Sequence, residues 1–91
     1  MFSVEYLKDP DADLDYGVDW SDWLQSGEVI STSSWTVPAG ITTHDEAKTD
    51  TGTTIWASGG TVKTSYDLTN KIVTDAARTD ERTIRITVEQ R

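Results

Sequence analysis

The sequence predicts an all-β fold, an immunoglobulin-like antiparallel β-sandwich of about seven short strands. Apolar and polar residues alternate along several stretches, which indicates strands with one buried face and one solvated face. Turn residues separate these stretches, and the abundance of Thr, Ser and Val favours strands over any helix longer than about one turn. A small closed barrel is the alternative fold for the same pattern.

The longest alternating run, residues 62–74, follows a Gly59-Gly60 turn, and we expect the rest of the domain to pack around it. Tyr66 lies early in this late strand, where its hydroxyl can return to nearby backbone as a tyrosine corner. An ordinary cross-strand aromatic is the other interpretation of Tyr66. The inward positions of the run are Val62, Thr64, Tyr66, Leu68 and Ile72.

The chain begins with a short alternating strand at residues 3–8. Pro10 ends it, because proline lacks a backbone donor and disfavours helix at the preceding residue. The next strand is expected to run through Tyr16, Val18 and Trp20. Ser21 then caps a short helical turn that Gly27 ends.

Three strands are expected in the middle of the chain, at residues 28–37, 41–44 and 49–58. Trp35 in the first of them is the expected central buried tryptophan. Residues 45–48 are polar and are expected to form a loop or a local turn.

A polar loop at residues 75–81 precedes the final strand at residues 82–90. Large apolar side chains at inward strand positions define the expected core. Its members are Trp35, Trp56, Tyr66, Leu68, Ile72, Ile84, Ile86 and Val88.

Length and composition exclude several classes of protein. The 91 residues correspond to one domain, and the absence of cysteine excludes a disulfide framework and a thiolate metal site. The net charge of −8 argues against a nucleic-acid surface, which needs a basic footprint. No basic n-region and no long apolar run follow Met1, so we expect neither a signal peptide nor a membrane span, and synthesis in a cytoplasm.

The residues offer little for catalysis or for a cofactor. His44 is the single histidine and has no evident partner for general-base work. Asp9, Asp11 and Asp13 are spaced like the first ligands of a calcium loop, but Leu14 and Trp20 stand where an EF-hand needs Gly and Glu. We therefore expect no enzymatic activity, no cofactor and no metal site.

Charge is distributed unevenly along the chain. Six aspartates crowd the first quarter, and Arg78, Arg82, Arg85 and Arg91 lie in the last stretch. The two regions could complement each other within the domain or between copies of the chain. Solubility is the simpler explanation of such surface charge.

The acidic stretch 9–23 is the expected docking surface, because Trp20 and Trp23 are the tryptophans that the strand pattern leaves free to be exposed. Residues 1–27 would then form an N-terminal strand and docking arm, and residues 28–91 the sandwich, within one domain. The same tryptophans could instead stack on sugars of a host glycan. The expected partner-binding residues are Tyr16, Trp20, Trp23, Leu24, Asp11, Asp13 and Asp15.

Several segments are similar to a known family. Residues 8–12 and 14–24, with their Asp-Trp-Ser-x-Trp-Leu element, resemble the opening of small virion proteins of tailed phages known as fiber-tail adaptor proteins. The resemblance continues through residues 30–40 and resumes at Trp56-Ala57-Ser58-Gly59-Gly60-Thr61. It also includes Tyr66, residues 70–74 and residues 78–82, whereas residues 44–50 carry none of the pattern.

The resemblance implies an immunoglobulin-like domain that is a structural part of a virion, made in the cytoplasm of a host bacterium. It implies no catalysis. The expected partners are other virion proteins of the tail, fiber, neck or capsid, together with copies of the chain itself, and neither nucleic acid nor membrane. A capsid decoration protein and a host-glycan-binding module are the alternative functions.

Overall fold

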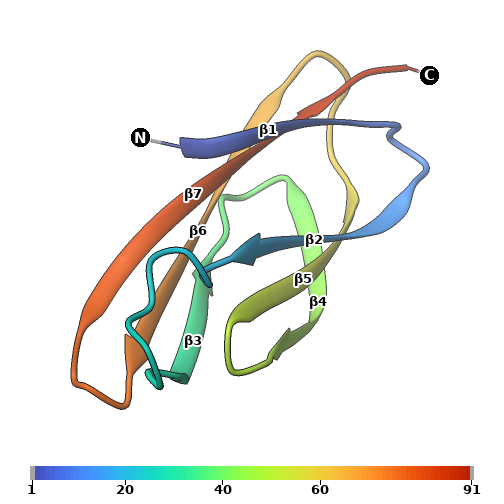
Figure 1. Cartoon of the computed structure of the whole chain (residues 1–91). Coiled ribbons are helices and arrows are strands. Elements are labelled where there is room, and N and C mark those ends of the chain that lie inside the picture. Colours follow the sequence, from blue (N-terminus) through green and yellow to red (C-terminus); the bar gives the residue numbers. More distant parts are fainter. Residues whose placement is uncertain (1, 91) are drawn as a thin grey trace.

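The computed structural model describes residues 2–90 and the side chains of residues 5–90. It confirms an all-β sandwich of two packed sheets (Figure 1). One sheet has four strands in the order β1-β7-β6-β3, and the other has three in the order β2-β5-β4. The strands are β1 (Phe2–Lys8), β2 (Asp13–Asp19), β3 (Ile30–Thr36), β4 (Ile41–Lys48), β5 (Gly52–Gly59), β6 (Ser65–Thr74) and β7 (Thr79–Val88).

All neighbouring strands pair antiparallel except β1, which runs parallel to β7. The expectation of a purely antiparallel sandwich therefore fails at this one pair. Parallel strands cannot be joined by a tight hairpin, and here the whole remaining chain separates them. The two strands of the expected arm, β1 and β2, belong to different sheets, and the turn at residues 9–12 carries the chain from one sheet to the other.

The core lies between the sheets, and the inward parity expected for β6 and β7 is confirmed. Ile84, Ile86 and Val88 of β7 are fully buried, as are Leu68 and Ile72 of β6. The hydrophobic effect contributes about 1.5–3 kcal/mol for each such side chain removed from water. These two strands therefore supply much of the stability of the domain.

Tyr66 forms the expected contact with nearby backbone. Its ring is buried, and its hydroxyl oxygen accepts a hydrogen bond of 2.9 Å from the backbone N–H of Thr61. Gly40 and Gly60 both have positive φ and lie so close to the ring that an added Cβ would approach it to 3.1 and 3.3 Å. The tyrosine thus holds two turns at one end of the sandwich.

Replacing Tyr66 with phenylalanine should lower the free energy of unfolding by about 0.5–1.5 kcal/mol, because the Thr61 N–H loses its acceptor while the ring remains. Urea unfolding monitored by tryptophan fluorescence would measure the change. A variant as stable as the wild type would contradict the tyrosine-corner interpretation.

Several strand boundaries differ from those predicted: β3 and β5 begin later, at Ile30 and Gly52, and three further differences have a clear structural cause. β6 begins at Ser65, because Lys63 has a φ of 68° and Val62 is exposed, so residues 61–64 form a turn. β4 continues to Lys48, and a bulge after His44, with Asp45 at a φ of 52°, takes the place of the expected loop. β7 begins at Thr79, because the hairpin turn before it is short.

The central buried tryptophan is Trp20, and the prediction for Trp35 is wrong. Trp20 is fully buried, and its indole Nε1 donates a hydrogen bond of 2.9 Å to Oδ1 of Asn70, which is itself fully buried. The same oxygen accepts from the hydroxyl of Thr53 on β5, and the amide nitrogen of Asn70 donates to Ser33 and Ser34 of β3. This polar network joins both sheets inside an apolar core.

Trp35 and Trp56 both differ from the core positions expected for them. Trp35 lies on an edge strand of its sheet, and it is half-buried and packs against the core from the side. Trp56 is 36% exposed, because its neighbours Ile55 and Ala57 take the inward positions of β5.

Candidate docking surface

The structure separates the residues expected to bind a partner into three groups. Tyr16 and Trp20 are buried in the core, so the expected exposure of Trp20 is wrong. Trp23 and Leu24 are half-buried and pack against the core. The exposed members are Asp11, Asp13 and Asp15.

Trp20 is buried because the following turn folds back over it. The carbonyl of Trp20 accepts from the N–H groups of Trp23 and Leu24, and the two indoles meet edge to face at 5.4 Å. The guanidinium of Arg82 covers the Trp20 ring at 4.4 Å. The expected cap at Ser21 is supplied instead by Asp19, whose carboxylate accepts from the N–H of Ser21.

An ion pair fastens the same turn to the β6–β7 hairpin. Arg78 places its guanidinium 4.1 Å from the centre of the Trp23 ring and binds both carboxylate oxygens of the buried Glu28. This guanidinium, with the Gln25 N–H and the Thr74 hydroxyl, lowers the pKa of Glu28 to about 2. The turn at residues 20–28 is therefore part of the folded domain.

The exposed aspartates lie along β2 and the turn before it. In β2 the side chains of Tyr16 and Val18 point into the core, so Asp13, Asp15, Gly17 and Asp19 belong to the outer face of the sheet. Asp15 makes no hydrogen bond or ion pair with any described residue. Its carboxylate therefore faces solvent without an internal counter-charge.

Trp56 occupies the middle of this outer face. Asp15 of β2 stands directly opposite it on one side, and His44 of β4 on the other. Side chains directly opposite on neighbouring strands have their Cβ atoms about 4.5–5.5 Å apart. The row Asp15–Trp56–His44 therefore crosses the whole three-stranded sheet.

Two carboxylates hold His44 in position. Its Nε2 lies 2.9 Å from Asp13 Oδ1, and its Nδ1 lies 2.9 Å from Asp45 Oδ2. The ring stacks on Trp56 with centroids 5.8 Å apart. Hydrogen bonds to Asp13, and then to Asp45, raise the pKa of His44 above its ordinary 6.5. Because the pKa is higher in the folded state, this contribution to stability is complete below pH 6.5 and is lost as pH rises through the folded pKa.

We expect His44 to titrate above pH 6.5, and Asp13→Asn to lower its pKa toward that value, because the first carboxylate partner is removed. The chain has a single histidine, so NMR titration of its imidazole gives one curve. Asp11→Asn removes a nearby charge that does not contact the ring and is the matched control. Equal titration of both variants would contradict the role of Asp13.

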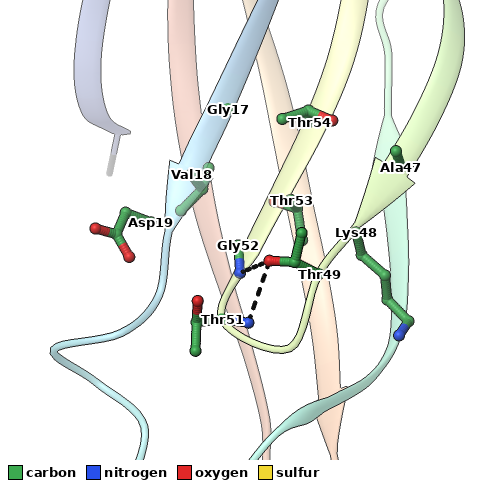
Figure 2. Close-up of a pocket in the computed structure, with 10 residues that line it drawn as sticks. All are labelled: Gly17, Val18, Asp19, Ala47, Lys48, Thr49, Thr51, Gly52, Thr53 and Thr54. Carbon is green, nitrogen blue, oxygen red and sulfur yellow. Dashed lines mark hydrogen bonds between the residues drawn. The ribbon is translucent and has the colours of Figure 1, made fainter.

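A shallow hollow of about 500 Å³ lies on the same face. Its lining includes Gly17 and Thr54, which are two residues from Asp15 and Trp56 along their strands. It forms because Gly17, Gly52 and Ala47 leave little side chain above the sheet (Figure 2). An added Cβ at Gly17 would lie 2.7 Å from the carbonyl oxygen of Thr53, so the backbone itself requires glycine there. The hollow is flanked by Asp19 and Lys48 (Figure 2).

The outer face of the three-stranded sheet carries aspartates, and its basic side chain is His44, which already has Asp13 and Asp45 as partners. Lys48 is the single Lys or Arg in the three strands, and its Nζ donates to the Ile30 carbonyl of the opposite sheet. On the other outer face, by contrast, Arg85 binds Asp67 through two hydrogen bonds. The three described arginines of the last stretch thus have partners within the domain, and Arg91 lies outside the described residues.

The side chains on the outer face of β2, β5 and β4 are suited to non-covalent contacts. Among the residues described, no group of three or more His, Cys, Asp or Glu side chains could hold a metal ion. Across the same residues, no helix long and apolar enough to cross a membrane was found. A flat sheet face with one exposed indole and fixed carboxylates suits binding to a protein.

Sequence reasoning missed Trp56 and His44 at this surface. A signal for Trp20 was present, because it shares the parity of Tyr16 and Val18 and so belongs inside. No such signal separated Trp56 from Ile55, since β5 is apolar at both parities around these positions.

The chain was compared with known proteins. No curated protein matches it. A family model described as the podophage GP4 fiber-tail adaptor protein gp77 matches residues 8–87. This match spans both sheets, from the end of β1 nearly to the end of β7. The chain therefore belongs to this family of podophage fiber-tail adaptor proteins.

Proposed function

We propose that the chain is a non-enzymatic structural component of a podophage virion that links a fiber to the tail. Two observations support this function: the family match and the aspartate-rich outer face of β2, β5 and β4 with Trp56 at its centre. An adaptor needs rigid surfaces that present fixed side chains, and a sandwich with a hydrogen-bonded core supplies them. A capsid decoration role would use the same fold but has no family match behind it.

We propose that the docking surface consists of Asp11, Asp13 and Asp15 together with His44 and Trp56. Tyr16 and Trp20 support it from inside the sandwich, whereas Trp23 and Leu24 lie at the other end of β2 from Asp13. Several copies of the chain assembled in fixed symmetry would let weak single contacts add through effective concentration.

The test is a phage in which the gene for this chain is interrupted. Particles made without the chain should contain tails and lack fibers, and expression of the wild-type chain in the host should restore the fibers. Cryo-electron microscopy of restored particles should show the domain between tail and fiber. Density on the capsid lattice, or normal fibers in its absence, would refute the adaptor function.

A further inference from the structure

We propose that the outer face of β2, β5 and β4 binds an arginine-bearing segment of another virion protein, with one guanidinium between Trp56 and Asp15. This inference rests on the proposed adaptor function and specifies its partner. The components are an exposed indole, a free carboxylate opposite it, and a hollow beside them.

The indole is held ready for such a contact. His44 stacks on the ring, and the carboxylates of Asp13 and Asp45 fix the imidazole from both nitrogens. Trp56 therefore loses little side-chain freedom when a partner binds, which reduces the entropic cost of association. The exposed part of the indole remains available for a second planar group.

The negative charge of this face favours a cationic partner. The free carboxylate of Asp15 and the exposed carboxylate of Asp19 make this face attractive to a cation and repellent to nucleic acid. A guanidinium satisfies both components of the site, because it stacks on an aromatic face and binds a carboxylate through two N–H groups. An ammonium lacks this planar geometry.

The domain already contains one site in which a guanidinium contacts both an indole ring and a carboxylate. The guanidinium of Arg78 lies over the Trp23 ring and also binds both oxygens of Glu28. Trp56 and Asp15 repeat the indole and the carboxylate of that site without an internal arginine. The described arginines of a second copy of the chain are poor sources of the guanidinium, since Arg78, Arg82 and Arg85 are engaged within their own domain.

The neighbouring hollow has room for the segment that carries the arginine. The glycine and alanine residues that line the hollow let a backbone approach the sheet. Thr54, which also lines the hollow, is two residues from Trp56 on the same face of β5. Residues two apart on a strand are about 6.6–6.8 Å from each other. A short extended segment can therefore rest in the hollow while its arginine reaches Trp56.

A binding experiment tests the chemistry. The probe is a capped peptide of alternating glycine and arginine, and the comparator is the lysine peptide of equal length and charge. In ¹⁵N-labelled full-length chain, the arginine peptide should shift the indole Nε1–H signal of Trp56 saturably and leave that of Trp20 in place. Binding should weaken about fivefold in Trp56→Ala and in Asp15→Asn, and less in Trp56→Phe, which keeps a weaker aromatic face.

Glu81→Gln is the matched control, since it removes one negative charge from the opposite sheet and should leave the affinity unchanged. Equal binding of the lysine peptide, or unchanged affinity in Trp56→Ala, would overturn the proposal.

Complementation of the interrupted phage separates this inference from the adaptor function. Expression of Trp56→Ala should restore at most about a fifth of the fibers that the wild-type chain restores. Full restoration by this variant would refute the arginine site and leave the adaptor function standing. Failure of the wild-type chain to restore fibers would refute the adaptor function itself.

Discussion

Replacing Trp20 with alanine should lower the free energy of unfolding by about 3–5 kcal/mol, which is the usual cost of deleting a buried aromatic side chain. Trp20 is fully buried, and the cavity would open beneath the ring of Trp23 and the guanidinium of Arg82. Domains of this kind are stable by only about 5–15 kcal/mol. The variant should therefore lose a large fraction of its stability.

Urea denaturation monitored by circular dichroism gives the measurement. Trp56→Ala is the matched control, because the same residue type is removed from an exposed position and should cost much less. Similar losses in the two variants would contradict the assignment of Trp20 as the central core tryptophan.

Replacing Asn70 with leucine should lower the free energy of unfolding by about 2–4 kcal/mol, although the number and branching of the side-chain heavy atoms are kept. Four groups lose a hydrogen-bond partner: the Trp20 indole N–H, the Thr53 hydroxyl, the Ser33 hydroxyl oxygen and the Ser34 carbonyl oxygen. Each buried group left without a hydrogen bond costs about 1–3 kcal/mol. Part of this loss is relieved where the Thr53 hydroxyl rotates toward another acceptor.

A double-mutant cycle identifies the bond between Trp20 and Asn70. Trp20→Phe removes the indole N–H while keeping an aromatic ring, so its effect and that of Asn70→Leu should be less than additive by about 1 kcal/mol. Strict additivity would show that the two side chains do not stabilise each other.

The alternation of apolar and polar residues was sufficient to predict the class of fold. It located β6 and β7 and the inward positions of Leu68, Ile72 and Ile84, because burial on one face imposes a period of two. The predicted hydroxyl contact of Tyr66 is also confirmed. The parallel pairing of β1 was beyond this reasoning, because alternation specifies which face is buried and not which strand lies alongside.

The burial of the tryptophans was predicted wrongly from the sequence pattern, and the reason is physical. It assigned Trp35 and Trp56 to the core for their size, whereas the structure buries Trp20 by means of a hydrogen bond to a residue 50 positions away. Asn70 stands between Leu68 and Ile72 in the inward parity, and such a polar position indicates a buried partner without naming it. Of the residues in the proposed docking surface, the sequence pattern indicated only the aspartates, because the bulge that aligns His44 with Trp56 depends on strand pairing.

The parallel alignment of β1 with β7 has a mechanical consequence. The start of β1 and the end of β7 lie at opposite ends of this pair, and the N and C labels stand on opposite sides of the molecule (Figure 1). Tension between these two points slides the strands past each other, so the bonds of the ladder from Phe2 to Lys8 share the load and must fail together. An unzipping geometry would break them one at a time under a much smaller force. Tension applied between the start of β1 and the end of β7 would therefore load this ladder in shear.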